Sequence, residues 1–250
     1  MNPDFRHLVI DVGNSGTKAA IFAGDELQLP VHHFAAEDWE GPDSLATNPG
    51  VKNIIYSTVA NVPPDRWIDK WKAAGRAVYA LDRTRPLPFV SDYLTMDTLG
   101  QDRIAVVAGT LHDYRTSRLI VDAGSCVTLD LVAADGHYRG GNISPGVTMR
   151  LRAMHERTAR LPLVDAGEVR EVVGRTTETA LRHGGMLGVV YEVEGLYRRL
   201  LDHYPDLQVV LTGGDAALLM PYFSISVHHS PHLVLRGLNV ILSSYVNEAL

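Results

Sequence analysis

The sequence is poor in cysteine, because Cys126 is the only one among 250 residues. A single thiol excludes an intrachain disulfide and a metal site built from several thiolates. It is also typical of a protein from a reducing compartment. We expect Cys126 itself to be a small buried residue and not a nucleophile.

The signatures of several common enzyme classes are also absent. The chain contains no GxxxxGK[ST] phosphate loop, no GxGxxG fingerprint, no HExxH pair and no GxSxG elbow. Its eleven histidines show no metal-ligand spacing. His228, His229 and His232 stand close together, but we interpret their surroundings as a loop and not as a metal site.

The chain has neither a strong positive charge nor a long apolar run. Its net charge is −6, with 46% hydrophobic and 21% charged residues, which is ordinary for a globular protein. This balance argues against nucleic-acid binding as the main function. No run approaches the roughly 18 to 20 apolar residues of a membrane span, and MNPDFRH lacks a signal-peptide core. We therefore expect a cytoplasmic protein without a nucleic-acid or membrane partner.

The most informative stretch is Leu8–Phe22, LVIDVGNSGTKAAIF. Two apolar runs joined by a Gly-rich polar turn predict a β-hairpin. Backbone N–H groups in such a turn can form a nest for anionic oxygens. Asn14 and Ser15 would add donors, Lys18 would add positive charge, and Asp11 could hold a cation. The alternative is a merely tight hairpin with a favourable Asn-Ser turn.

A second copy of this pattern lies nearly half the chain away. Leu119–Ser125 reads LIVDAGS, and Leu8–Asn14 reads LVIDVGN. Two units that open alike indicate a duplicated domain. We therefore expect two acidic turns, carrying Asp11 and Asp122, to face each other across a cleft.

A third turn lies in Val209–Ala216, VVLTGGDA. Gly213 and Gly214 would let a ligand approach the backbone, and a following helix N-terminus would favour negative charge. An ordinary strand-to-helix turn is the alternative. In this order, the three turns resemble the actin, hexokinase and Hsp70 superfamily, whose third turn approaches adenosine. The resemblance implies an α/β fold of two RNase H-like (actin-like) domains, with a duplicated β-sheet core and an interdomain nucleotide cleft. We place these domains at residues 1–115 and 116–250.

Strand and helix patterns alternate between the turns, which is typical of an α/β protein. The expected further strands cover residues 53–59, 77–81, 119–121, 127–132, 138–143 and 209–211. The expected helices cover residues 66–74, 103–112, 147–160, 177–183, 186–203 and 233–250. We expect Asn142 and Pro145 to shape a loop before one of these helices, and residues 91–102 to form a polar loop.

Asp102 stands at an expected helix start, in the sequence LGQDR. A carboxylate at this place can cap free backbone N–H groups and favour the helix dipole. It could instead be a general base that orients a substrate hydroxyl for phosphoryl transfer. Arg103 could bind a carboxylate or a phosphate with two hydrogen bonds. From these residues alone, the sequence predicts an ATP-dependent phosphotransferase.

Seven motifs in order narrow the resemblance to one family. They are DVGNSGTK (11–18), GQDR (100–103) preceded by Tyr93, DAGSCVTLD (122–130), GGNISPG (140–146), GRTTETALRHG (174–184), LTGGDA (211–216) and HLVLRGLN (232–239). Together they resemble type III pantothenate kinase over nearly the whole chain. The resemblance implies transfer of phosphate from ATP to pantothenate, the first step of coenzyme A biosynthesis. It also implies Mg²⁺, a monovalent cation (K⁺ or NH₄⁺) and a homodimer with its substrate site near the subunit interface.

The resemblance assigns the site residues as follows. The ATP-binding residues are Asp11, Val12, Gly13, Asn14, Ser15, Gly16, Thr17, Lys18, Ser125, Gly213 and Gly214. The pantothenate contacts are Tyr93, Gly100, Gln101, Asp102, Arg103 and Thr177. Asp102 is the proton acceptor, Asp11 works with Mg²⁺ through the phosphates, and Asp122 binds the monovalent cation. The similarity between the two acidic turns, taken alone, would instead have assigned Mg²⁺ to Asp122.

Simpler roles stay open for some of these residues. Ser125 keeps the hydroxyl but loses the methyl of the threonine usual in the family. Tyr93 could be a half-buried loop aromatic, and Thr177 could be the N-cap of its helix. The competing functions are a regulatory protein on the same fold and a kinase for another small acceptor, such as a sugar or acetate. The intact acidic and basic residues of the motifs favour the enzyme.

Overall fold

The computed structural model describes residues 5–58, 63–112 and 115–248, with only the backbone of Glu248. The chain divides into two compact units. The first contains residues 1–113 and 232–250, and the second contains residues 114–231. This division differs from the sequence-based one over the C-terminal helix, which belongs to the first unit.

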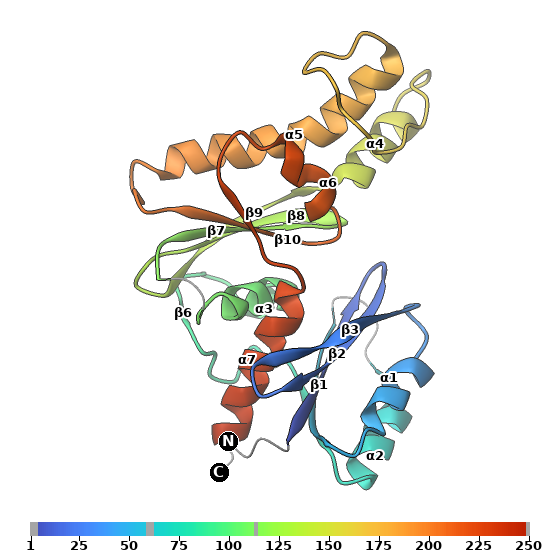
Figure 1. The fold of residues 1–250 in the computed structure, drawn as a ribbon, viewed down its shortest axis with the longest axis vertical. Helices are drawn as coiled ribbons and strands as arrows, with labels where there is room; N and C mark the ends of the chain where they lie inside the picture. The colour runs from blue at the N-terminus through green and yellow to red at the C-terminus, as the bar shows by residue number, and fades with distance from the viewer. Residues whose placement is uncertain (1–4, 59–62, 113–114, 249–250) are drawn as a thin grey trace. The chain divides into compact units, whose positions relative to one another are not determined.

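The first unit is built on a sheet with the strand order β3-β2-β1-β4-β5 (Figure 1). Its strands are β1 (Arg6–Gly13), β2 (Gly16–Ala23), β3 (Glu26–Phe34), β4 (Val51–Thr58) and β5 (Ala77–Ala80). The first three strands are antiparallel neighbours, while β4 pairs in parallel with β1, and β5 in parallel with β4. The predicted hairpin is confirmed, with Gly13 paired to Gly16 across the turn.

Strand β3 was not among the expected elements, because its sequence ELQLPVHHF contains Pro30 and none of its residues is buried. A proline lacks the N–H that a central strand needs, but it is tolerated in an edge strand. β3 lies at the edge of the sheet, which explains how Pro30 fits there.

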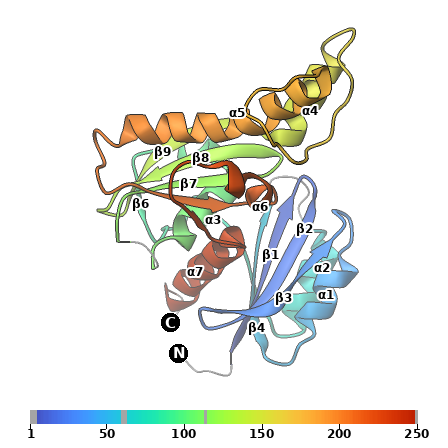
Figure 2. The same cartoon turned by 45° about the horizontal axis from the view of Figure 1, so that its top comes forward.

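Helices cover both faces of this sheet, as Figures 1 and 2 show. α1 (Glu40–Ala46) and α2 (Asp65–Ala73) pack on one face, where Trp39 and Trp71 join Leu8 and Ile10 of β1 in the core. α3 (Gln101–Gly109) and α7 (Leu233–Glu248) pack together on the other. Their backbones approach so closely that a side chain on Gly237 would collide with the carbonyl oxygen of Ala105.

Between β5 and α3, the chain forms the short strand β6 (Val90–Ser91) and the 3₁₀ helix η1 (Met96–Thr98). The expected polar loop therefore contains some regular structure. This segment carries Tyr93, one of the expected substrate residues.

The second unit repeats the strand arrangement of the first. Its strands are β7 (Arg118–Ala123), β8 (Cys126–Val132), β9 (His137–Pro145), β10 (Gln208–Thr212) and β11 (Val227–His229). They run in the order β11-β10-β7-β8-β9, with an antiparallel β7-β8-β9 meander and parallel β10 and β11. The duplicated sheet that the LIVDAGS repeat predicts is therefore confirmed.

The helices of the second unit are α4 (Val147–Glu156), α5 (Thr177–Leu200), the four-residue α6 (Ala216–Leu219) and the 3₁₀ helix η2 (Met220–Tyr222). The prediction of two helices over 177–203 was wrong, because α5 runs through Gly184 and Gly185 without a break. Gly185 is buried against α4, where an added Cβ would lie 2.7 Å from Leu151 Cδ2. Close packing therefore explains a glycine inside this helix.

Three smaller expectations were also wrong. Cys126 is exposed, since it is the first strand residue after the second hairpin turn. His228 and His229 lie in β11 and not in a loop. Asn142 and Pro145 belong to β9, whose pairing with β8 continues as far as Pro145.

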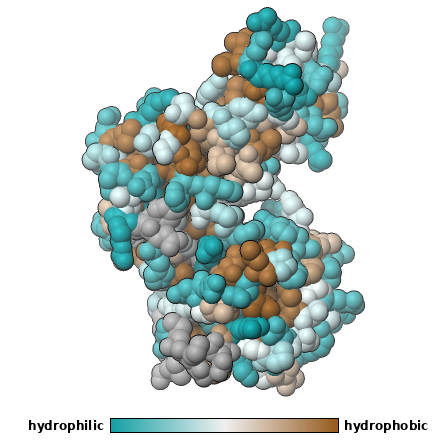
Figure 3. Space-filling model, viewed as in Figure 1, coloured by the Kyte–Doolittle hydropathy of each residue, from teal (hydrophilic) through white to brown (hydrophobic). Residues whose placement is uncertain are grey.

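Surface and membrane features agree with a globular protein. The face in Figure 3 shows mostly hydrophilic and intermediate residues, interrupted by apolar patches. Within the described ranges, none of the helices combines the length and the apolar character that crossing a bilayer requires.

Candidate functional site

The tip of the first hairpin has the backbone that the sequence predicted. Asn14 and Ser15 form its exposed turn. Gly16 has φ +143°, and a Cβ there would lie 2.7 Å from the carbonyl oxygen of Phe34. Only glycine fits this position without strain. Thr17 and Val12 pair just below the turn, and both are buried.

Asp11 lies on β1 between two polar neighbours on the same face of the sheet. Lys18 of β2 and Ser57 of β4 are its direct partners in the strand register. Ser57 Oγ donates a hydrogen bond of 2.9 Å to Asp11 Oδ1. Burial raises the pKa of the Asp11 carboxyl, and the nearby charge of Asp102 adds to this rise, while Ser57 and Lys18 oppose it. A bound cation would compensate the charge of this carboxylate.

Asp102 lies in the first turn of α3, beside the N-cap residue Gly100. Its Oδ1 accepts a hydrogen bond of 2.9 Å from the backbone N–H of Arg103. The side chain folds so closely over Gly100 that an added Cβ there would collide with this oxygen. The capping hypothesis therefore holds in part, because the carboxylate does bind a first-turn N–H. Gln101, the residue before Asp102, binds Thr58 of β4, and the preceding strand residue, Ser57, binds Asp11, so the end of β4 connects the two acids.

Gln101 is the first residue of α3 and binds two strand ends at once. Its Oε1 accepts a hydrogen bond of 2.7 Å from the N–H of Thr58, the last residue of β4. Its Nε2 donates a hydrogen bond of 3.0 Å to the carbonyl oxygen of Leu81, directly after β5. Sequence reasoning missed this role, since nothing local in LGQDR indicates which backbone groups the amide reaches.

Arg103 and Tyr93 lie together although they come from different segments. Arg103 is only 4% exposed, and its guanidinium carbon lies 5.5 Å from the centroid of the Tyr93 ring. This distance is typical of a cation–π contact. Tyr93 is half-buried, as its simpler interpretation expected, and Ser91 Oγ accepts a hydrogen bond of 3.1 Å from its N–H.

The second hairpin tip gathers residues from three strands and two loops. Asp122 has Thr128 of β8 and Thr212 of β10 as its register partners. Gly213 has φ +98°, and an added Cβ would lie 2.5 Å from Asp122 Oδ1. Ser125 is exposed at the turn. The expected Asp122, Ser125 and Gly213 therefore lie together within the second unit.

Two features of this tip differ from the sequence analysis. Gly146 was not recognised as part of it, yet an added Cβ there would collide with the carbonyl oxygen of Gly124, and its N–H donates to Ser125 O at 3.1 Å. The break in SPG before α4 was the available signal. The expected helix after Gly214 is only α6, which is too short to supply a strong dipole. Asp215, which precedes it, has its carboxyl pKa raised by burial.

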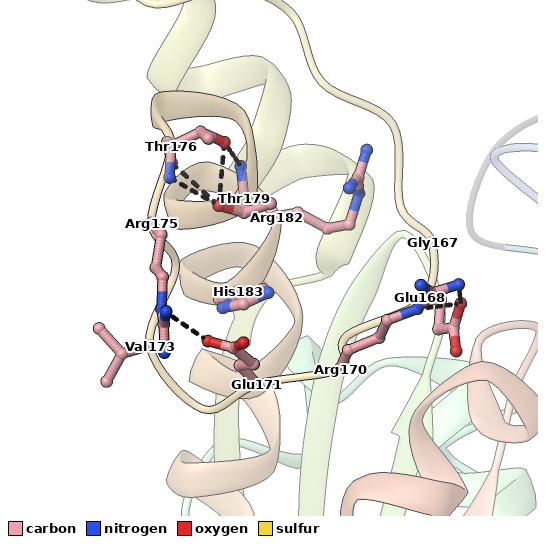
Figure 4. A pocket seen from close by; sticks show the side chains of 10 residues that line it. All are labelled: Gly167, Glu168, Arg170, Glu171, Val173, Arg175, Thr176, Thr179, Arg182 and His183. Atoms are coloured by element: carbon pink, nitrogen blue, oxygen red, sulfur yellow. Dashed lines mark hydrogen bonds and ion pairs between the residues drawn. The ribbon is translucent and has the colours of Figure 1, made fainter.

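The start of α5 corrects one prediction. Thr176, and not Thr177, is the N-cap, since its Oγ1 accepts a hydrogen bond of 3.1 Å from Thr179 N–H in a capping box. Thr177 is exposed. A pocket of about 530 Å³ lies beside this helix start, and Thr177 is not among its lining residues (Figure 4). The lining residues are Gly167, Glu168, Arg170, Glu171, Val173, Arg175, Thr176, Thr179, Arg182 and His183.

Comparison with known proteins decides the family. A family model described as "Type III pantothenate kinase" matches residues 7–199. The chain belongs to the type III pantothenate kinase family. A relative from Bacteroides fragilis, named "Type III pantothenate kinase", is 36% identical over 95% of this chain and 97% of its own length.

Solved structures confirm the fold. A Campylobacter jejuni protein assigned to the Baf family of transcriptional activators covers 96% of this chain and 99% of its own, with 23% identity and a TM-score of 0.55. The ROK hexokinase of Thermus thermophilus covers 97% of this chain and 100% of its own, with 13% identity and a TM-score of 0.51. The predicted actin- and hexokinase-like fold class is therefore correct.

The individual roles that the resemblance assigns stay predictions. Within the first unit, the structure brings together Asp11, Lys18 and Asp102, and it pairs Tyr93 with Arg103. Within the second, it brings together Asp122, Ser125 and Gly213. That the two hairpin tips face one cleft also stays a prediction.

Proposed function

We propose that this protein transfers the terminal phosphoryl group of ATP to the primary hydroxyl of pantothenate. The products are 4′-phosphopantothenate and ADP, in the first step of coenzyme A biosynthesis. Family membership supports the substrates. The observation that carries the chemistry is the pair of carboxylates, Asp11 and Asp102, which the end of β4 connects through Ser57 and through Gln101, the residue before Asp102.

The proposed reaction gives Asp102 the role of proton acceptor. The hydroxyl oxygen of pantothenate forms a bond to the γ-phosphorus, and the bond from that phosphorus to the bridging oxygen breaks. ADP leaves with the electron pair, and the hydroxyl proton passes to the carboxylate of Asp102. Because the transition state of such a transfer is loose, orientation of the hydroxyl is the main contribution of this group.

The proposed substrate contacts are Tyr93, Gly100, Arg103 and Thr177, with Gln101 beside them. The buried guanidinium of Arg103 suits the carboxylate of pantothenate, which it can bind with two parallel hydrogen bonds. Its contact with the Tyr93 ring supports a fixed orientation of that guanidinium. The carboxylate end of the substrate is therefore the part that we assign to this pair.

The proposed nucleotide contacts are the two hairpin tips and the Gly-Gly turn. In the first unit they are Asp11, Val12, Gly13, Asn14, Ser15, Gly16, Thr17 and Lys18. In the second unit they are Ser125, Gly213 and Gly214. Lys18 would offset phosphate charge, and the turn would donate backbone N–H groups.

ATP implies a divalent cation, and the residues of the first tip fit Mg²⁺. Asp11 supplies a carboxylate whose burial and neighbouring acid favour a positive ion. Mg²⁺ in kinases is usually held by one or two carboxylates together with substrate phosphates. When bound, the metal would neutralise charge on the phosphates.

The second tip fits a monovalent cation. Asp122 lies between two threonines in the strand register, so its surroundings are rich in oxygen ligands. We assign K⁺ or NH₄⁺ to Asp122. We further propose a homodimer, on the family resemblance, and a cytoplasmic location, which the single cysteine supports.

A coupled assay of ADP release tests the function. Purified protein with ATP, Mg²⁺ and K⁺ should phosphorylate pantothenate in preference to a panel of other small acceptors, which includes sugars and acetate. Phosphorus NMR should identify a phosphomonoester on the primary hydroxyl. Turnover of another panel member with pantothenate inert would favour the alternative kinase, and no turnover with any of them would favour the regulatory protein.

A further inference from the structure

One side chain binds the Asp11 carboxylate, and another anchors the start of the helix that carries Asp102. The serine that binds Asp11 was not assigned any role from the sequence. The glutamine next to Asp102 was assigned to substrate, but its amide binds the protein backbone. These two side chains come from β4 and from the first residue of α3.

Ser57 holds the Asp11 carboxylate in place. Ser57 is 1% exposed, and its hydroxyl donates a hydrogen bond of 2.9 Å to Asp11 Oδ1. Parallel pairing of β1 with β4 places the two residues side by side. Hydrogen bonds to an ionised carboxylate are stronger than neutral ones, so loss of this hydroxyl would free the carboxylate and disfavour its charge.

Gln101 holds the start of α3 against the ends of two parallel strands. Its carbonyl oxygen binds Thr58 N–H at 2.7 Å, and its amide nitrogen binds Leu81 O at 3.0 Å. Since Asp102 follows directly, this side chain fixes where the Asp102 backbone begins. Both ends of the amide are therefore engaged by the protein itself.

The two contacts form one continuous connection. Ser57 and Thr58 are consecutive residues of β4, so the same strand end binds Asp11 through one residue and Gln101 through the next. Asp11 and Asp102 are therefore both held close to the end of β4. A shift of about 1 Å in reacting groups can cost roughly 100-fold in rate, so the separation of these acids matters for transfer.

We propose that Ser57 and Gln101 are positioning residues, which together set the separation of the Asp11 and Asp102 carboxylates for phosphoryl transfer. This inference rests on the proposed function. It also changes the role of Gln101, which acts through Asp102 and not by touching pantothenate.

Kinetics distinguish positioning from substrate contact. Gln101→Met has a similar length but loses both hydrogen bonds, and Gln101→Glu keeps only the acceptor for Thr58 N–H. We expect Gln101→Met to lower kcat about 10- to 100-fold with the KM for pantothenate within about twofold, and Gln101→Glu to lower it less. A raised KM with an unchanged kcat would overturn the proposal. Gln28→Ala is the matched control, because Gln28 is a partly exposed residue of the edge strand β3, and its amide donates to the carbonyl oxygen of Glu26.

Two measurements without turnover complete the test. Gln101→Met should accelerate hydrogen exchange at the Thr58 amide, and Ser57→Ala should shift the carbon NMR resonance of the Asp11 carboxyl at a fixed neutral pH, because its hydrogen bond is lost. Ser243→Ala is the control, because the Ser243 hydroxyl is buried in the first unit without a hydrogen-bond partner among the described residues. Unchanged exchange and an unchanged carboxyl resonance would overturn the proposal. If the wild-type enzyme fails to phosphorylate pantothenate, the proposed function fails, while these two readouts still report on the connection.

Discussion

The two sheets share one strand order, but their acidic strand ends carry different chemistry. Asp11 has a lysine and a serine as its register partners, whereas Asp122 has two threonines. A second carboxylate, Asp102, influences Asp11 from α3. The same scaffold is therefore present twice, and the different residues beside each acid are the basis on which we propose Mg²⁺ for Asp11 and a monovalent cation for Asp122.

The helix after the fifth strand adds to this difference. In the first unit, the next α-helix after β5 is α3, which begins with Gln101 and Asp102. In the second, β11 is followed by α7, and α7 belongs to the first unit. In the described part of the chain, the helix that follows β11 therefore belongs to the other unit, whereas the first unit contains the helix that carries its proposed proton acceptor.

The largest expected effect comes from removing that proton acceptor. Asp102→Asn should lower kcat about 100- to 10,000-fold, the range of general-base contributions, because the amide cannot accept the hydroxyl proton. Its melting temperature should stay close to that of the wild type.

Asp122→Asn should instead change the dependence of the rate on K⁺. If the rate depends on K⁺ equally in the wild type and in Asp122→Asn, the assignment of the monovalent cation to Asp122 is contradicted.

Glycine replacements at the two tips should cost stability. Gly213→Ala forces a left-handed φ and a collision with Ala123 O, so we expect a loss of about 1–3 kcal/mol in the free energy of unfolding. Gly16→Ala should behave alike because of Phe34 O. Gly136→Ala, with φ +83° and open space around it, isolates the cost of φ alone and should be milder. Urea unfolding of the three variants measures the difference, and equal losses would contradict the close packing.

Making the first tip resemble the second should weaken nucleotide binding. Lys18→Thr introduces the residue type found beside Asp122 and removes a cation close to Asp11. We expect the affinity for ATP to fall about tenfold, since a charge-assisted contact to phosphate is lost. Calorimetric titration with a non-hydrolysable ATP analogue measures this. Unchanged affinity would show that Lys18 does not contact the phosphates.

The smallest expected effect is a pH dependence of stability at His7. His7 is buried and bonded to Asn239 Oδ1 at 2.8 Å, and burial lowers its pKa. Because the unfolded chain binds a proton more readily, the stabilisation is complete above the ordinary histidine pKa and is lost as the pH falls below it. The urea midpoint should therefore drop between pH 7.5 and 5.5. His7→Gln should flatten this drop, and an equally steep drop in that variant would assign it to other groups.

Local patterns predicted the hairpins and the duplicated sheet, because a Gly-rich turn between apolar runs is a short-range signal. Contacts made only in the folded chain were not predictable. The reach of Gln101 to Thr58 and Leu81 depends on two strand ends meeting α3. Likewise, the pair Gly184 and Gly185 predicted a helix break, but α5 is continuous, and Gly185 packs closely against Leu151.

The candidate site shows the same division. The motifs identified the acids and glycines, since their chemistry is visible in the residue type. Ser57 was missed because the sequence around it, NIIYSTV, does not indicate that its hydroxyl binds Asp11. The expected N-cap, Thr177, is one residue after the observed N-cap, Thr176, because the two adjacent threonines are equally good capping residues by type.

Rapid-quench measurement of a single turnover tests the central claim most directly. Wild type, Asp102→Asn and Asp122→Asn are each mixed with labelled ATP, Mg²⁺, K⁺ and pantothenate at saturating concentrations, and phosphopantothenate is counted against time. We predict that the transfer step slows by at least about 100-fold in Asp102→Asn and far less in Asp122→Asn. A transfer step of unchanged rate in Asp102→Asn, or equal slowing in both variants, would contradict the assignment of the chemistry to the first unit.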